Sequence, residues 1–101
     1  MVSATKLSKH DRYVMELCHR IGPQYDLVRT HVPLSRDKRR IAEIDVYACK
    51  GDHTDIFEVK CSHRIHKAEK QLRRVKNILH LRNASCFFYC GSSGALVPVG
   101  I

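Results

Sequence analysis

Apolar residues recur along the chain in patterns that predict two helices and several strands. Ser8 and Asp11 form a variant of the capping box, and beyond them apolar residues recur at helical spacing, which predicts a helix over residues 9–21. A second stripe steps by three and four from residue 65 to residue 79, and Asn83 can end this second helix. The chain therefore begins with an amphipathic helix and carries a longer one in its second half.

The remaining apolar runs are short and are typical of strands. Their ranges are 25–32, 41–49, 55–61, 84–90 and 95–99, with a polar loop at 33–40 and turns at 50–53 and 91–94. Short connections suit an antiparallel meander for the first three strands, and the second helix should bring the next strand in parallel. We therefore predict one α/β domain over residues 1–101, an αβββαβ sandwich whose central mixed sheet is flanked by helices.

Acidic residues alternate with apolar ones in the second and third strands. If residues 50–53 are the loop, Asp45 lies directly opposite Glu58, and Glu43 lies opposite Lys60. Facing carboxylates destabilise a sheet unless a cation offsets them, and oxygen ligands of this kind suit Mg²⁺ or Mn²⁺. Lys60 emerges on the same face, where an ammonium could bind a scissile phosphate or orient a water.

Apolar residues occupy the alternate positions of these strands. Ile44, Val46 and Ala48 are expected to share one core face with Phe57 and Val59. The alternative for the charged set is a solvated face with ordinary ion pairs.

The composition adds a strong positive charge to this picture. The 101 residues carry a formal net charge of +8, which favours a polyanionic partner, nucleic acid before an anionic membrane surface. Two basic runs flank the acidic strands, and both should contact phosphates without reading sequence. They are Arg36, Lys38, Arg39 and Arg40 in the loop, and Lys67, Lys70, Arg73, Arg74 and Lys76 on the second helix.

The cysteines and the N-terminal segment bear on location. Five cysteines, an odd number, and a polar segment from Met1 to His10 without a secretory apolar core predict reduced thiols in the cytoplasm, including that of a host cell if the gene is viral. No apolar run reaches the roughly 18 residues of a membrane span. The cysteines and seven histidines form no paired-knuckle zinc pattern, so a structural zinc site is not expected.

The chain resembles the PD-(D/E)XK nuclease superfamily. The resemblance rests on Ile44-Asp45, on Glu58-Val59-Lys60 after a short turn, and on the basic helix that follows, within an element order similar to the restriction-endonuclease-like core of that family. Ile44 replaces the proline of the nominal motif. In size, and in the acid Glu16 on the first helix, the chain resembles archaeal and viral Holliday junction resolvases most.

The resemblance implies a set of functional residues. Asp45 and Glu58 would ligate a metal together with the main-chain carbonyl of Val59, Lys60 would assist hydrolysis, and Glu16 would complete the acidic set. Gln71 resembles an auxiliary glutamine of some members, although a polar residue beside the apolar stripe is an equal alternative. The glutamine-x3-tyrosine pattern of RecB-like exonucleases is not met, since Val75 follows Gln71.

Three classes of function are compatible with these residues. The first is a Mg²⁺- or Mn²⁺-dependent endonuclease that hydrolyses DNA, and a junction resolvase is its sharper subclass. Resolution requires a two-fold dimer, for which the apolar segment 95–101 could supply an interface or else form an edge strand. The second is a non-catalytic nucleic-acid-binding module that keeps the nuclease fold. A module for anionic membranes or protein partners has only the net charge in its favour.

Overall fold

A computed structural model describes residues 7–80 and 83–101; the first part of the polar N-terminal segment lies outside them. The chain forms α1 (Lys9–Ile21), a short 3₁₀ turn (Gly22–Gln24), β1 (Leu27–Arg36), β2 (Arg39–Lys50), β3 (His53–Lys60), α2 (Ile65–Leu79), β4 (Ala84–Cys90) and β5 (Ala95–Val99). This is the predicted order of a helix, three strands, a helix and two strands.

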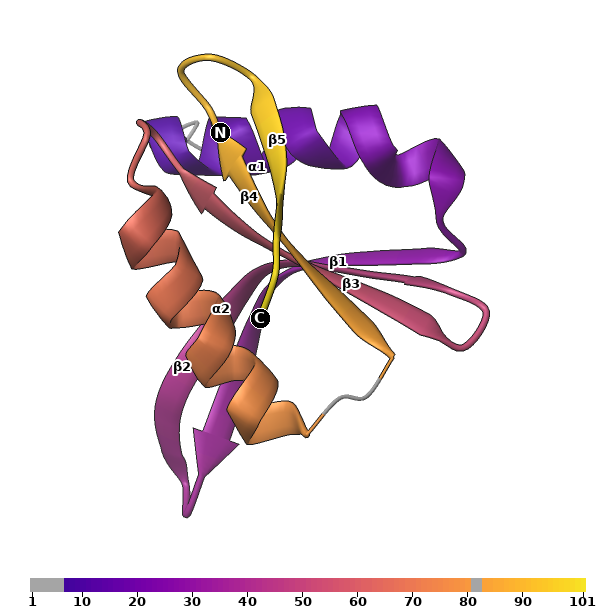
Figure 1. Cartoon of the computed structure of the whole chain (residues 1–101), viewed down its shortest axis with the longest axis vertical. Coiled ribbons are helices and arrows are strands. Elements are labelled where there is room, and N and C mark those ends of the chain that lie inside the picture. Colours follow the sequence, from indigo (N-terminus) through magenta and orange to yellow (C-terminus); the bar gives the residue numbers. More distant parts are fainter. Residues whose placement is uncertain (1–6, 81–82) are drawn as a thin grey trace, which may run out of the picture.

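The five strands form a single mixed sheet in the order β1-β2-β3-β4-β5. The pairs β1–β2, β2–β3 and β4–β5 are antiparallel, whereas β3 and β4 are parallel, with α2 as their crossover. The predicted meander and crossover are therefore both confirmed. Figure 1 shows the strong twist of this sheet.

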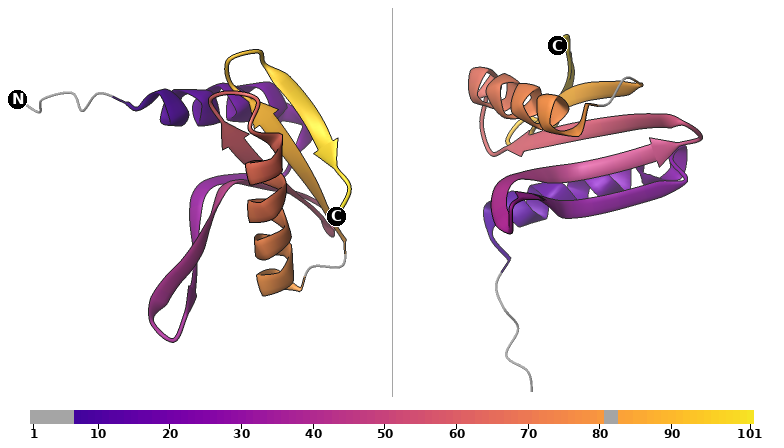
Figure 2. Two further views of the ribbon diagram at one scale, coloured as in Figure 1. Left: turned by 60° about the vertical axis from the view of Figure 1, so that its left-hand side comes forward. Right: turned by 90° about the horizontal axis from the view of Figure 1, so that it is seen from below.

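The two helices cover opposite faces of the sheet (Figure 2). Val14, Leu17 and Ile21 of α1 pack on Val46 and Phe57. On the other face, the apolar stripe of α2 packs on the sheet through Leu72 and Val75, which meet Ile44 and Ile56. Within the described residues, neither helix is long and apolar enough to cross a membrane.

The predicted loop at residues 33–40 is wrong, because β1 and β2 continue through it as an arm. Arg36 pairs with Arg39, and the turn between them has Asp37 and Lys38 at φ 51° and 65°, as a two-residue hairpin turn requires. Pro33 is tolerated because β1 is an edge strand, where a missing N–H disrupts no central ladder. A bulge between Leu34 and Ser35 shifts the register of this arm by one residue.

The expectation that Ile44, Val46 and Ala48 share one core face is also wrong. Val46 and Ala48 belong to the core beneath α1, whereas Ile44 belongs to the core beneath α2. The simple alternation fails because β2 separates from β3 at this point. Counted from the β2–β3 turn, Val46 is the last residue of β2 that pairs with β3, and the part of β2 nearer the arm does not pair with it. Both faces of the sheet are therefore apolar at this point.

The helix ends match the sequence signals only in part. The Ser8 Oγ accepts a hydrogen bond from the Asp11 N–H at 3.0 Å, as the capping motif predicts. The α2 helix, however, ends at Leu79 and not at Asn83, because His80 takes the left-handed conformation with φ 51° and its N–H bonds to the Lys76 carbonyl.

The last strand is an interior edge strand of the chain. Ala95, Val97 and Val99 of β5 pack against the core on the α2 side. The apolar segment 95–101 is thus used within the fold, which is one of the two alternatives left open by its sequence.

A close approach of Gly91 to α1 predicts a specific sensitivity. A Cβ built at Gly91 would lie 2.1 Å from Cδ2 of Tyr13, a ring held in the core beneath α1. Gly91→Ala should therefore lower the free energy of unfolding by about 1 to 3 kcal/mol, the usual cost of overpacking, as measured by urea denaturation. Gly100→Ala, with no neighbour within 4 Å, should stay close to wild type. Equal stability of the two variants would contradict this packing.

Candidate functional site

The candidate site forms where β2 leaves β3. The predicted register is confirmed at Cys49–Thr54 and Tyr47–Ile56, and the β3 ladder ends one pair later at Val46–Phe57. Asp45 and Glu58 are therefore next in line but are not a ladder pair, which corrects the expectation that they face each other within regular sheet. The separation of the strands exposes main-chain groups of β3 to side chains.

The Asp45 carboxylate fills the gap between the separating strands. Its side chain is 9% exposed, and its Oδ2 accepts a hydrogen bond from the Val59 N–H at 2.9 Å. The carbonyl of Val59 points into the same gap and lies 3.0 Å from the His10 Nε2, which also lies 3.3 Å from the Asp45 Oδ2. The side chain of Asp45 thus takes the place of a main-chain acceptor, while the Val59 carbonyl faces the His10 imidazole.

Glu58 is buried beside Asp45 and is costly to ionise. Its side chain is only 6% exposed, and its Oε2 lies 3.4 Å from the Lys60 Nζ. Burial first and the Asp45 carboxylate second raise the pKa of Glu58 to about 8, although Lys60 opposes this shift. Perturbed carboxyl groups of this kind are typical of functional sites.

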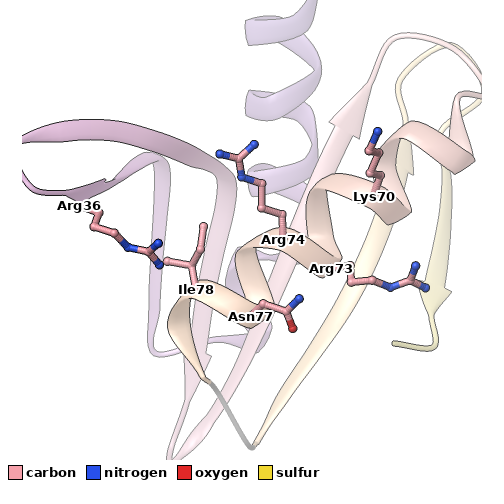
Figure 3. A pocket seen from close by; sticks show the side chains of 6 residues that line it. All are labelled: Arg36, Lys70, Arg73, Arg74, Asn77 and Ile78. Atoms are coloured by element: carbon pink, nitrogen blue, oxygen red, sulfur yellow. The ribbon is translucent and has the colours of Figure 1, made fainter.

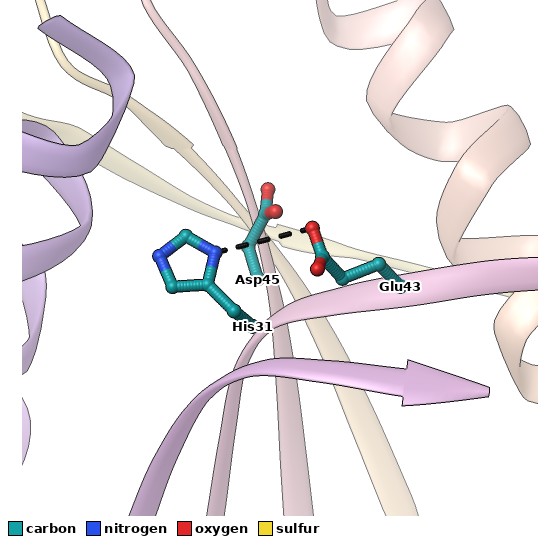
Figure 4. Close-up of side chains that lie close together, drawn as sticks. All are labelled: His31, Glu43 and Asp45. Carbon is teal, nitrogen blue, oxygen red and sulfur yellow. Dashed lines mark ion pairs between the residues drawn. The ribbon is translucent and has the colours of Figure 1, made fainter. Parts of the chain in front are cut away.

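Two more side chains extend the acidic site along β1 and β2. His31, Glu43 and Asp45 each offer one ligand atom, and these three atoms all lie within 4.8 Å of one another (Figure 4). The Glu43 Oε1 also lies 3.9 Å from an Arg40 guanidinium nitrogen. Arg40, expected on a phosphate path, is therefore close to the acidic site.

Glu16 is not brought to this site, which corrects the expectation that it completes the acidic set. Its side chain lies on the exposed side of α1, in a surface hollow with Leu7 and Met15. The residue of α1 that does reach the acidic site is His10, which lies on the side of the helix that faces the sheet and contacts Asp45. An acid at residue 16 points away because helical periodicity directs Val14 and Leu17 into the core.

Gln71 lies at the border of the acidic residues. It lines a hollow of about 100 Å³ between α2 and β2, together with Glu43 and Arg74. Its amide is exposed and makes no direct contact with Asp45 or Glu58 among the hydrogen bonds of the described residues. Gln71 is thus positioned next to Glu43 and one step removed from the carboxylate pair.

One basic residue of the arm and three of α2 line a second hollow. This hollow of about 360 Å³ lies between the two elements (Figure 3), and its lining includes Arg36, Lys70, Arg73 and Arg74. Arg74 also lines the hollow beside Glu43, so the basic and acidic regions adjoin. The other residues expected to bind nucleic acid are exposed but do not line this hollow; they are Lys38, Arg39, Arg40 and Lys67. Lys76 instead donates a hydrogen bond to the Ile101 carbonyl.

Two histidines of the site were missed in the sequence. His10 precedes the apolar stripe of α1, and its helical phase relative to Val14 and Leu17 could have placed it against the sheet. His31 gave no such signal, because the pairing of β1 with β2 depends on the bulge in the predicted loop.

A separate polar cluster lies near the far end of β3. Asp55 is buried and accepts hydrogen bonds from Tyr25 and His53, and Ser85 contacts the same His53 Nε2 at 3.3 Å. A hydrolase triad needs serine and acid on different ring nitrogens, so this cluster does not form one. Its partners account for the buried carboxylate of Asp55.

The donor set of the site fits a hard divalent cation. Asp45, Glu58 and the Val59 carbonyl offer oxygen ligands, and a bound ion would offset both the burial and the Asp45 charge that raise the pKa of Glu58. Deprotonation of Glu58 then accompanies metal binding, as metal–ligand linkage requires.

The raised pKa of Glu58 predicts how stability varies with pH. The folded protein keeps a proton on Glu58 up to a pKa of about 8, whereas the unfolded chain releases it near about 4.3. In EDTA the free energy of unfolding should therefore fall as pH rises between these values, by roughly 3 to 5 kcal/mol if this group acts alone. Urea denaturation at about pH 5 and about pH 8 measures the fall.

Glu58→Gln should remove most of this pH dependence. Glu16→Gln, which changes an exposed carboxylate of α1, should retain the wild-type dependence. An undiminished slope in Glu58→Gln would show that another group titrates.

Comparison with known proteins supports the fold. No family model and no curated protein sequence matches the chain. Among solved structures, the EndoMS–dsDNA2 complex matches with a TM-score of 0.51 and 18% identity over 88% of this chain. The match spans 38% of the EndoMS chain, so the present chain corresponds to a part of that protein. The similarity confirms the expected restriction-endonuclease-like α/β fold.

Proposed function

We propose that this domain hydrolyses phosphodiester bonds in DNA with the help of a divalent cation, Mg²⁺ or Mn²⁺. The observation that carries the proposal is the buried pair Asp45 and Glu58, next to the Lys60 ammonium. Two buried carboxyl groups side by side lower the stability of the folded protein unless a cation binds them. If they had no role beyond the fold, replacing them with apolar residues would raise the stability. The resemblance to PD-(D/E)XK nucleases, carried by the same residues, supports the proposal.

The residues would divide the work between them. Asp45, Glu58 and the Val59 carbonyl would hold the cation, which when bound supplies a water of lowered pKa and neutralises phosphate charge. Lys60, 3.4 Å from Glu58, would bind the scissile phosphate and stabilise the charge that develops on it. His10 is close enough to Asp45 and Val59 to donate a hydrogen bond to either of these ligands, or to be a further ligand of the cation itself.

DNA would reach the site along the basic hollow. The hollow between the arm and α2 presents guanidinium and ammonium groups that suit backbone phosphates, and Arg74 links it to the acidic region. A double-stranded DNA partner agrees with the EndoMS complex, which contains such DNA. Gln71, beside Glu43, would contact the substrate near the scissile group.

Junction resolution remains a narrower form of this proposal. It requires two sites related by a two-fold axis, and hence a homodimer. A competition between a four-way junction and a linear duplex distinguishes a resolvase from a general nuclease. The second candidate is a non-catalytic module that binds nucleic acid, which the large positive charge favours.

The proposal predicts a loss of cleavage in three separate variants. Asp45→Asn, Glu58→Gln and Lys60→Met should each reduce the cleavage of DNA in Mn²⁺ by about 10² to 10⁴-fold, the usual effect of losing a charge-stabilising or acid–base group. A panel of junction, flap, duplex, single-stranded DNA and RNA substrates measures the rates.

Asp52→Asn is a matched control, because Asp52 is an exposed acid in the turn between β2 and β3. It should cleave at the wild-type rate. Full activity in the Asp45 variant would exclude this site, and salt-dependent binding without cleavage by the wild type would favour the non-catalytic module.

The basic hollow predicts a specific dependence of binding on salt. Each phosphate that the protein no longer neutralises should make the slope of log K against log salt shallower by about 1. Arg36→Ala combined with Arg74→Ala should therefore reduce the slope by about 2, as measured by fluorescence anisotropy with duplex DNA in Ca²⁺. Lys50→Ala serves as the control, since Lys50 is exposed at the opposite end of β2. Equal slopes in both variants would contradict this path.

A further inference from the structure

A register shift brings a histidine to the acidic site. Near the tip of the arm, Ser35 pairs with Arg40, but beyond the bulge Leu34 pairs with Ala42, so Ile41 is an extra residue of β2. Because of this one residue, His31 falls opposite Asp45, between the pairs Thr30–Val46 and Val32–Ile44. His31 has φ 50° and interrupts the ladder at this point, and its ring lies in one group with the carboxylates of Glu43 and Asp45. The bulge thus selects which side chain of β1 accompanies Asp45.

The imidazole of His31 is oriented as in a metal-binding histidine. Its Nδ1 faces the Glu43 Oε2 at 3.9 Å, within the group that includes Asp45 (Figure 4). Its Nε2 lies 3.4 Å from the Asp11 Oδ1 on α1. Histidines that ligate metals generally donate their second ring N–H to a carboxylate, which fixes the tautomer and leaves the other nitrogen free to coordinate. Asp11 fills this position.

The local charge also favours a cation here. Asp11, Glu43 and Asp45 gather three of the ten acidic side chains of a chain whose net charge is +8. The side chains of His31 and Glu43 are 40% and 37% exposed, so they can close the spacing of up to 4.8 Å around an ion. Bond lengths of about 2.1 Å place neighbouring ligands of an octahedral ion roughly 3 Å apart. The closure needed is of the order of 1 to 2 Å, within the reach of half-exposed side chains.

We propose that His31, Glu43 and Asp45 form a second cation site, with Asp11 as the residue that positions His31. An imidazole ligand favours a transition metal, so this site should take Mn²⁺ in preference to Mg²⁺. Asp45 would then be a residue that helps to hold both cations. Any part of the second cation in cleavage rests on the proposed function, but its binding does not.

The test is the number of Mn²⁺ ions bound, measured by the electron paramagnetic resonance of free Mn²⁺ during titration. The wild type should bind two ions per chain, and His31→Gly should bind one. Glycine is chosen because His31 has φ 50°, a backbone conformation that glycine adopts freely. His66→Ala, which removes an exposed histidine of α2, should still bind two.

Two further variants separate this proposal from the nuclease proposal. Asp11→Asn should leave two ions but weaken one of them by about 10 to 100-fold, the usual effect of losing an orienting carboxylate. Glu58→Gln should retain an ion that disappears when His31→Gly is added. An equal number of ions in the wild type and in His31→Gly overturns the second site. If His31→Gly binds one ion fewer than the wild type, but the wild type cleaves no DNA, the second site is upheld and the proposed function is refuted.

Discussion

The hydrogen bond from the Val59 N–H to the Asp45 carboxylate supports the whole acidic region. It forms where β2 and β3 separate, and a buried N–H left without an acceptor there would cost about 1 to 3 kcal/mol. Together with burial, which is the larger cause, the same carboxylate raises the pKa of the neighbouring Glu58. The residue that completes the sheet thus also contributes to the electrostatics of the acidic site.

The separation of the strands has a second consequence, since it turns main-chain groups into part of the site. In a continuous ladder the Val59 carbonyl would be taken by a neighbouring strand, whereas here it meets the His10 imidazole. The β1–β2 arm continues past this point and is free to follow its own register. The break in pairing between β2 and β3 is therefore the place where both the acidic site and the arm begin.

Charge is divided between two adjoining regions of the molecule. The acidic residues lie between the strands, where burial strengthens their mutual repulsion, and the basic residues lie on the arm and on the outer side of α2. Arg74 and Arg40 lie at the boundary, each near Glu43. A polyanion on the basic region would approach the carboxylates only with a cation between them, because like charges repel at this distance.

Hydrophobic periodicity in the sequence determined the two helices, the strand order and the parallel crossover, since these depend on local spacing and short connections. It also placed Asp45 next in line to Glu58, because the length of the β2–β3 turn sets that register. The arm, the two-sided core around Ile44 and the position of His31 were decided only by the tertiary structure. Helical phase relative to Val14 and Leu17 could place Glu16 outward and His10 against the sheet, but which groups His10 meets depends on where β2 and β3 part. Packing across both faces of the sheet and one extra residue in the β1–β2 ladder select the other features, and no local pattern of residues encodes them.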